Sequence, residues 1–188
     1  MKIYVVRHGE SENNLKEKWT GWYDTPLTEK GIEDAKEAGK ILKGITFDKI
    51  YASDLSRAID TARTAIPNCE YETSPQLREI NVGKLENQPN KVLNNEQLAH
   101  VFVNGYEDYD GESNEHFYNR VAGFAKGLES AGYENVAIFT HAGWLRRMLN
   151  FVMGVRLPRE NVVCNNCTVG IFEYKDGVWR LYSWINVT

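Results

Sequence analysis

Short apolar runs alternate along the chain with longer segments in which apolar residues recur every three or four positions. The apolar runs are residues 2–8 (KIYVVRH), 48–53 (DKIYAS) and 135–141 (NVAIFTH). Each run is short and continuous, as is typical of a strand that is buried on both faces of a sheet. Helices are predicted within residues 25–44 and over residues 55–66, 113–128 and 142–154. Strands that alternate with helices indicate a mostly parallel sheet covered on both faces.

The C-terminal segment of the chain predicts an antiparallel pair of strands. Residues 168–185 (TVGIFEYKDGVWRLYSWI) contain two strand-like runs around Lys175-Asp176-Gly177, and an Asp-Gly pair fits a tight hairpin turn. A further short strand is expected at residues 70–73, before a stretch of turn residues with little periodicity. We therefore predict an α/β fold, a three-layer α/β/α sandwich whose mostly parallel sheet has an antiparallel contribution from the C-terminal hairpin.

Length and charge narrow the class of protein. The 188 residues suit a single domain over residues 1–188, and 42% apolar with 26% charged residues is ordinary for a globular chain. A net charge of −4 without a Lys/Arg-rich stripe argues against nucleic acid or an anionic membrane as the main partner. No segment has the length of a signal peptide or a membrane span, so we expect a cytoplasmic protein.

The cysteines do not predict a framework or a metal site. Cys69, Cys164 and Cys167 are an odd number without a secretory signal, which makes a disulfide framework improbable. Cys164 and Cys167 have C-x-x-C spacing, but no second ligand pair lies nearby and a strand follows them. We interpret this pair as two small residues in a loop and expect no bound metal.

Residues with cationic side chains follow several of the predicted strands. Arg7 and His8 end the first strand, Arg57 lies just beyond the second, and His141 with Gly143 follows the late strand. Ligands of open parallel sheets bind outside the carboxyl ends of the strands, so these residues should meet at one edge. Guanidinium groups and the N-terminus of a helix suit a phosphoryl group, and an imidazole there can attack phosphorus.

Departure of a leaving group would need a proton donor. Glu79 in LREI is the candidate, on a loop after the third predicted strand, and Glu10 and Glu86 are its rivals. Composition and spacing do not decide among the three carboxyl groups.

Five motifs occur together in a characteristic order. They are RHGESENN at 7–14, TGWYDTPLTEKGIEDA at 20–35, YASDLSRAIDTA at 51–62, LREINVGKLE at 77–86 and FTHAGWLR at 139–146. In these motifs the sequence resembles the histidine phosphatase superfamily, in the branch that includes cofactor-dependent phosphoglycerate mutases and small phosphomonoesterases. The resemblance covers nearly the whole chain, and five motifs in order are far more specific than any one.

The resemblance implies a role for each matched residue. It makes His8 the nucleophile that carries the phosphoryl group and Glu79 the general acid and then the base for water. It implies phosphate-binding roles for Arg7, Asn14, Arg57, His141 and the backbone of Gly143. Preorganised cations stabilise the charge of a phosphoryl-transfer state, so neither a metal nor another cofactor is required.

The motifs leave the net reaction open. About sixty residues separate Glu79 from His141, and this insert is short and acidic, which favours hydrolysis over transfer because mutases carry a longer, basic insert. Thr20 and Asn87 depart from the usual phosphatase version. Phosphoglycerate-mutase-type transfer and a non-catalytic binder of phosphorylated ligands are the alternatives. A small phosphorylated metabolite is the expected substrate, and a homo-oligomer is possible.

Other residues near these motifs have a weaker signal. Trp19, Trp22 and Tyr23 are candidates to flank the pocket, although aromatic side chains more often pack in a core. His100 and His116 fall outside every motif, and we expect them to be ordinary surface or boundary residues.

Overall fold

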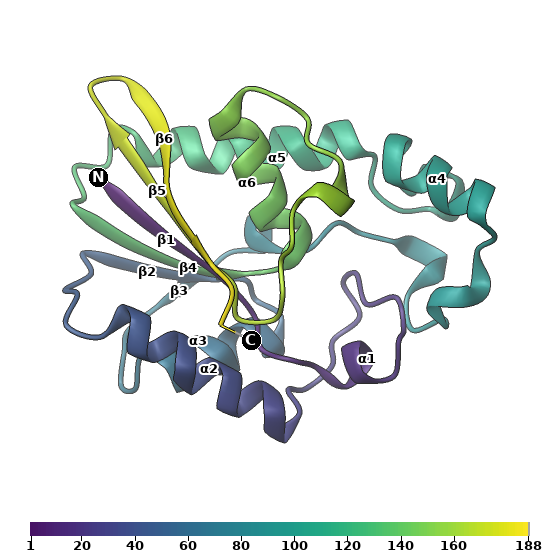
Figure 1. Cartoon of the computed structure of the whole chain (residues 1–188), viewed down its shortest axis with the longest axis horizontal. Helices are drawn as coiled ribbons and strands as arrows, with labels where there is room; N and C mark the ends of the chain where they lie inside the picture. The colour runs from purple at the N-terminus through teal and green to yellow at the C-terminus, as the bar shows by residue number, and fades with distance from the viewer. Residues whose placement is uncertain (188) are drawn as a thin grey trace.

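A single mixed sheet organises the computed structural model, which describes residues 1–187 (Figure 1). Within these residues the order of the six strands is β3-β2-β4-β1-β5-β6. Their bounds are β1 Lys2–Arg7, β2 Lys49–Ala52, β3 Glu72–Thr73, β4 Asn135–Thr140, β5 Val169–Lys175 and β6 Val178–Ile185. β1 to β4 pair in parallel, and β5 and β6 add an antiparallel hairpin. The predicted fold class is confirmed.

Helices cover both faces of this sheet (Figure 1). α2 and α3 lie on one face, and α5 and α6 lie on the other. The α-helices are α1 Glu12–Leu15, α2 Glu29–Leu42, α3 Ser56–Ala65, α4 Asn95–Asn104, α5 Asn114–Leu128 and α6 Ala142–Met153. Short 3-10 helices are η1 Pro75–Leu77, η2 Gly83–Leu85, η3 Asn90–Val92, η4 Glu107–Tyr109 and η5 Arg159–Asn161. None of the described helices is long and apolar enough to cross a membrane.

α1 was not predicted from the sequence, and α4 was expected only as a helical stretch around His100 without bounds. α1 is a single turn whose cap, Ser11, bonds reciprocally with Asn14. α4 lies in the stretch that the sequence analysis treated as a short acidic insert. Asn94 caps α4 through the Gln97 backbone, and the Gln97 side chain returns to the Asn94 backbone, which satisfies two helix-end donors. The apolar stripe of this helix is short and lies among polar residues, so the sequence pattern did not predict its bounds.

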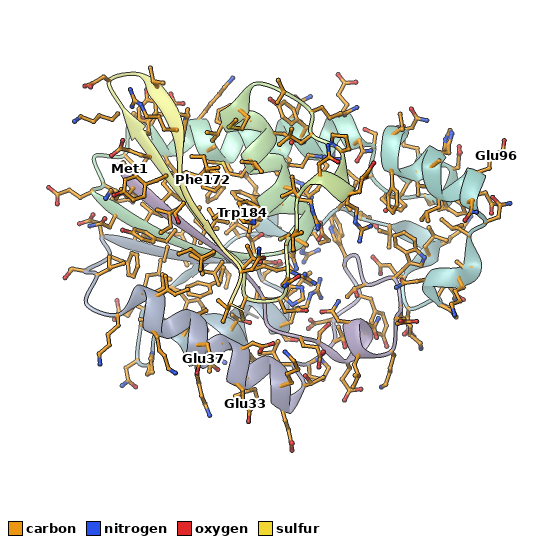
Figure 2. All side chains as sticks on the ribbon, viewed as in Figure 1. Met1, Glu33, Glu37, Glu96, Phe172 and Trp184 are labelled. Atoms are coloured by element: carbon orange, nitrogen blue, oxygen red, sulfur yellow. The ribbon has the colours of Figure 1, made fainter. Side chains whose placement is uncertain are left out.

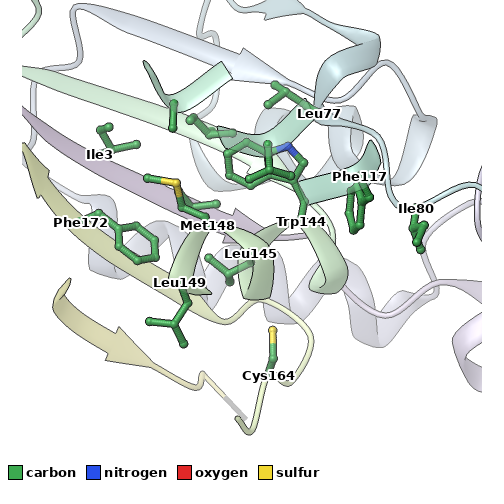
Figure 3. Close-up of a cluster of buried hydrophobic side chains, with 14 of the residues drawn as sticks. Ile3, Leu77, Ile80, Phe117, Trp144, Leu145, Met148, Leu149, Cys164 and Phe172 are labelled. Atoms are coloured by element: carbon green, nitrogen blue, oxygen red, sulfur yellow. The ribbon is translucent and has the colours of Figure 1, made fainter. Parts of the chain in front are cut away.

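The burial of β1 on both faces explains why its apolar run is continuous. Ile3 and Val5 face the cluster that contains Trp144 and Phe172 (Figure 3), whereas Tyr4 and Val6 face the cluster under α2 and α3. Successive side chains of a strand point to opposite faces, so both faces must be apolar when both are covered. Outside these layers, charged side chains such as Glu33 and Glu37 on α2 point into solvent (Figure 2).

The C-terminal hairpin forms at the predicted turn. Asp176 and Gly177 have φ values of 55° and 75°, as both central residues of a type I′ turn require. Because β5 runs antiparallel to β1, its amino-terminal end lies at the edge where β1 and β4 have their carboxyl ends. The loop before β5 is thereby placed beside the residues that follow β1.

Candidate active site

Two histidines meet at the carboxyl edge of the sheet. His8 follows β1 and His141 follows β4, and their ring centroids are 5.2 Å apart. The backbone N–H of His8 donates to Thr140 O at 2.9 Å, so the β1–β4 pairing extends to the site. Both side chains are buried, at 5% and 0% exposure. Parallel strands therefore deliver both rings to one small volume.

The hydrogen bond of His8 fixes which nitrogen is free. Its Nδ1 lies 2.7 Å from Gly9 O, and a carbonyl oxygen can only accept, so Nδ1 carries the proton. Burial, and then the charges of Arg57 and Arg7, lower the pKa of His8 well below its ordinary 6.5. The ring is thus neutral at pH 7, and Nε2 keeps its lone pair for attack.

His141 is held by a residue that the sequence analysis did not single out. Its Nε2 lies 2.9 Å from Ser53 Oγ, and its Nδ1 is buried without a hydrogen-bond partner. Burial, followed by the charges of Arg57 and His8, lowers the pKa of His141 well below 6.5. Ser53 lies within the motif that contains Arg57, but that motif gave no sign that its hydroxyl would orient a histidine.

Arg57 and Arg7 bring one buried and one partly buried guanidinium group to these rings. Arg57 is 1% exposed and donates to Tyr23 O at 3.0 Å and to Gly21 O at 2.8 Å. Arg7 donates to Cys164 O at 2.6 Å. Burial lowers the pKa of Arg57 to about 10, while the Glu79 carboxylate opposes the shift, so its charge persists at pH 7.

Neither guanidinium has an anionic partner. The arginines that pair with carboxylates in the described chain are others, Arg63, Arg78 and Arg120. The Nε atoms of Arg7 and Arg57 are also buried without a hydrogen-bond acceptor. Buried polar groups are nearly always satisfied, so these unsatisfied donors indicate a position for an anion.

The Glu79 carboxylate is close enough to Arg7 and Arg57 to oppose the lowering of both pKa values by burial. Its Oε2 accepts the Gly143 N–H at 2.9 Å, and its Oε1 accepts the N–H of Ile80 at 2.9 Å. Its rivals are engaged elsewhere: Glu10 accepts from Thr28 Oγ1 at 2.8 Å, and Glu86 accepts from the backbone of Trp22 at 2.8 Å.

Gly143 is needed for this contact. A Cβ at this position would lie 2.0 Å from Oε1 of Glu79. The helix N-terminus predicted at residues 142–143 is present, since α6 begins at Ala142. The Gly143 N–H that the sequence analysis expected to face phosphate here donates to Glu79 instead.

Asn14 is linked to the loop that contains His8 by Asn166, a residue that the sequence did not predict. Its Oδ1 accepts from Ser11 Oγ at 3.1 Å and from Asn166 Nδ2 at 3.2 Å. Asn166 Nδ2 also lies 3.2 Å from His8 O. The loop before β5 is thus tied to both ends of the first motif, a contact across 158 residues that no sequence pattern announces.

Arg120 holds the loop that carries Glu79. Its guanidinium forms a fork with Glu112, at 3.0 Å from Nε to Oε1 and 2.8 Å from Nη2 to Oε2. The same guanidinium donates to Gln76 O at 2.8 Å, Arg78 O at 2.9 Å and Glu79 O at 3.1 Å. One arginine of α5 therefore fixes the backbone that leads to the acid/base candidate.

The aromatic candidates lie on both sides of this loop. Trp22 Nε1 donates to Glu79 O at 2.7 Å and helps to hold the loop. The ring of Trp19 packs against Tyr106 and Phe102, with centroid separations of 5.7 and 6.4 Å. Tyr23 accepts a hydrogen bond from Arg57 through its backbone carbonyl oxygen.

The remaining singled-out residues lie away from the reacting groups or serve structure. His100 and His116 have side-chain exposures of 52% and 73%. Cys164 and Cys167 are buried free thiols in the loop before β5, and burial raises both pKa values, Cys167 to about 12. Within residues 1–187, no three His, Cys, Asp or Glu side chains gather as metal ligands would.

Comparison with known proteins agrees with this geometry. Residues 3–187 match the histidine phosphatase superfamily (branch 1). A probable phosphoglycerate mutase of Enterobacter sp. (strain 638) is 29% identical over 98% of this chain and 90% of its own length. The alpha-ribazole phosphatase of Shigella flexneri has a TM-score of 0.86 at 25% identity, covering 100% of this chain and 97% of its own. A phosphoserine phosphatase mutant of Entamoeba histolytica, solved with phosphoserine, has a TM-score of 0.85 at 26% identity, covering 99% and 97%.

Proposed function

The chain belongs to the histidine phosphatase superfamily, and from this membership and the site geometry we propose that it hydrolyses phosphomonoesters through a phosphohistidine on His8. One observation carries the proposal. A neutral imidazole, with Nδ1 held by Gly9 O and Nε2 free, lies beside two guanidinium groups that have buried, unpartnered Nε atoms and no carboxylate partner. Such a site combines a nucleophile with a receptor for the dianion on which it acts.

The first half-reaction transfers the phosphoryl group to the protein. Nε2 of His8 attacks phosphorus while the bond from phosphorus to the alcohol oxygen breaks, and that oxygen takes a proton from the carboxylic acid form of Glu79. Arg7, Arg57 and His141 donate to the equatorial oxygens as charge builds on them. The donors are already oriented by Cys164 O, Tyr23 O, Gly21 O and Ser53 Oγ, so little reorganisation is needed.

The second half-reaction returns the enzyme to its starting state. The Glu79 carboxylate removes a proton from water, whose oxygen attacks the phosphohistidine, and the electron pair of the nitrogen–phosphorus bond returns to Nε2 of His8. Glu79 regains the proton that it gave to the alcohol. The hydrogen bonds from Gly143 and Ile80 hold its carboxylate in place between the two steps. No metal takes part in the proposed cycle.

Phosphoglycerate-mutase-type transfer is the second candidate. The names of curated relatives favour it, because several are probable phosphoglycerate mutases at 28–30% identity. The short insert before His141 favours hydrolysis instead, because it leaves less chain to exclude water from the phosphohistidine. A non-catalytic binder has no observation in its favour, since every proposed catalytic position holds a competent side chain.

The expected substrate is a small phosphorylated metabolite. The Entamoeba relative, which was solved with phosphoserine, supports a ligand of this size. We also propose that residues 1–188 form a single functional unit and that the protein is cytoplasmic. Three free thiols suit a reducing compartment.

The test compares wild type with two histidine variants in the presence of EDTA. The substrates are p-nitrophenyl phosphate and 3-phosphoglycerate with 2,3-bisphosphoglycerate. His8→Ala should abolish phosphate release, whereas His100→Ala, which changes an exposed histidine, should retain it. Wild type quenched in alkaline denaturant, in which phosphohistidine survives, should gain the mass of one phosphoryl group at His8. Conversion of 3-phosphoglycerate to 2-phosphoglycerate without phosphate release would establish the mutase, and loss of activity in EDTA would refute the metal-free cycle.

A further inference from the structure

The loop that follows β1 contains a glycine that orients the His8 ring. The carbonyl oxygen of Gly9 lies 2.7 Å from Nδ1 of His8 and accepts its proton. A Cβ on Gly9 would lie 2.2 Å from Gly31 O on α2, so this close approach requires glycine. Glycine has the largest backbone freedom of any residue. The carbonyl that orients the His8 ring therefore needs a restraint from elsewhere in the fold.

Hydrogen bonds from two other segments hold the peptide group between His8 and Gly9. Its carbonyl, His8 O, accepts from the backbone N–H of Cys167 at 3.2 Å and from Asn166 Nδ2 at 3.2 Å. Its N–H belongs to Gly9 and donates to Oγ1 of Thr61 at 3.0 Å. Both ends of this peptide group are thus fixed, and the contact with Thr61 is the one made by Gly9 itself.

The Thr61 hydroxyl has one possible arrangement in these contacts. Thr61 lies on α3 and is fully buried, at 0% exposure. Its Oγ1 lies 2.7 Å from Arg57 O, and a carbonyl oxygen can only accept, so the hydroxyl proton belongs to that bond. A lone pair of Oγ1 then accepts the Gly9 N–H. The hydroxyl therefore connects the loop of the nucleophile to the helical turn that contains Arg57.

Packing alone does not require a hydroxyl at this position. Valine has nearly the shape of threonine, and the neighbouring buried positions of α3 are Ala58, Ala62 and Ala65. A valine at position 61 would leave the Gly9 N–H buried without an acceptor, which is costly. The Arg57 carbonyl would lose less, because a carbonyl inside an α-helix also accepts a backbone N–H. The contact with Gly9 is thus the one that depends on threonine.

We propose that Thr61 is a positioning residue for the nucleophile. Through Gly9 it holds the carbonyl that keeps a proton on Nδ1 of His8 and so leaves Nε2 free to attack. This inference rests on the proposed function, because it takes His8 as the group that attacks phosphorus. The Arg57 guanidinium keeps separate partners, Gly21 O and Tyr23 O, so phosphate binding does not depend on the Thr61 hydroxyl.

Three single variants separate this role from packing. Thr61→Val keeps the shape and removes the hydroxyl, whereas Thr61→Ser keeps the hydroxyl and removes a methyl group. Thr64→Val makes the first change at a half-buried position of the same helix. Thr61→Val should lower kcat/KM for p-nitrophenyl phosphate, which reports the first half-reaction, about 10- to 100-fold, the effect of an unsatisfied buried donor. The other two variants should stay within about threefold of wild type.

Two further measurements show whether the loss arises at His8. The inhibition constant of inorganic phosphate should change by less than about threefold in Thr61→Val, because the arginines keep their partners. Long-range proton–nitrogen NMR at pH 7 should show the His8 proton on Nδ1 in wild type and partly on Nε2 in Thr61→Val. The spectrum of His8→Ala identifies the signals of this ring.

Several results would overturn the positioning role. They are equal losses of kcat/KM in Thr61→Val and Thr61→Ser, a loss in Thr61→Val no larger than in Thr64→Val, and a weakening of phosphate inhibition that matches the loss. A His8 proton on Nε2 in wild type would also overturn it, even if Thr61→Val does not fold. Failure of wild type to release phosphate from p-nitrophenyl phosphate would instead overturn the proposed function. The His8 proton in wild type and Thr61→Val would then still decide whether Thr61 orients the ring.

Discussion

Replacing Arg120 by methionine tests how the loop of Glu79 is held. The side chains of Arg120 and Glu112 have exposures of 12% and 5%, so the substitution leaves a buried carboxylate without its guanidinium. Breaking a buried pair on one side costs about 3–5 kcal/mol. His116 Nδ1 remains 2.7 Å from Glu112, Trp22 still donates to Glu79 O, and Trp144 still donates to Gln76 O.

Because these contacts survive, we expect Arg120→Met to lower the free energy of unfolding by about 3 kcal/mol, the lower end of that range. Urea denaturation followed by far-ultraviolet circular dichroism measures it. Arg180→Met is the matched control, because Arg180 is exposed and its one described hydrogen bond goes to Lys175 O. The phosphatase kcat should fall as well, because the backbone that leads to Glu79 loses three hydrogen bonds from the Arg120 guanidinium.

A double variant separates the buried charge from the rest of the effect. Glu112→Gln with Arg120→Met removes the uncompensated carboxylate, so it should be more stable than Arg120→Met alone by at least about 1 kcal/mol. The kcat should not recover, because the carbonyl groups of Arg78 and Glu79 still lack the guanidinium. If Arg120→Met unfolds at the same urea concentration as Arg180→Met, the pair does not hold the loop and the reasoning fails.

Three further outcomes follow from the site and its surroundings. Glu79→Gln should lower kcat/KM, which reports the first half-reaction, about 10²- to 10⁴-fold for an alkyl phosphate and much less for p-nitrophenyl phosphate, whose leaving group needs no proton; equal losses in kcat/KM would remove Glu79 as the acid. His8 and His141 have folded pKa values well below 6.5, so the unfolded chain binds protons that the folded chain does not. The free energy of unfolding should therefore decrease as pH falls below about 6.5, by up to about 1.4 kcal/mol per pH unit for each ring; urea midpoints that do not change between pH 7.5 and 5.5 would contradict this. Gly31→Ala should destabilise the protein by more than about 1 kcal/mol, because a Cβ there would lie 2.1 Å from Glu10 O; a thermal melt equal to wild type would show that the backbone yields.

The sheet and its active edge could be predicted because each depends on a local pattern joined to a general rule. A buried parallel strand requires an apolar run, and the carboxyl ends of such strands lie together, so Arg7, His8 and His141 could be expected at one place before any contact was known. The bounds of α4 were not predicted because its apolar stripe is short and lies among Asn, Gln and Glu. Its stability comes from a capping box and from packing on α5, not from strong periodicity.

The choice of Glu79 and the supporting residues could not be obtained from spacing. Glu10, Glu79 and Glu86 look alike in sequence, and only the approach of Gly143, 64 positions away, distinguishes one of them. Arg120 and Asn166 donate hydrogen bonds to backbone carbonyl groups. Every residue has such a group, so no sequence pattern indicates these contacts. Residues that orient others through the main chain become visible only when the chain is folded.

The position of β1 has a consequence for how the molecule is assembled. β1 lies between β4 and β5, so both its hydrogen-bonding edges are filled by residues 135–140 and 169–175. During synthesis β1 emerges before both of its neighbours, and it lacks β4 until residue 140 and β5 until residue 175 have followed. Contacts between such distant segments form slowly, because a long loop must close before they are made. A nascent chain that stops short of β5 should therefore leave one edge of β1 with unpaired backbone N–H and C=O groups, and the proposed phosphate site should form only after β5 has paired.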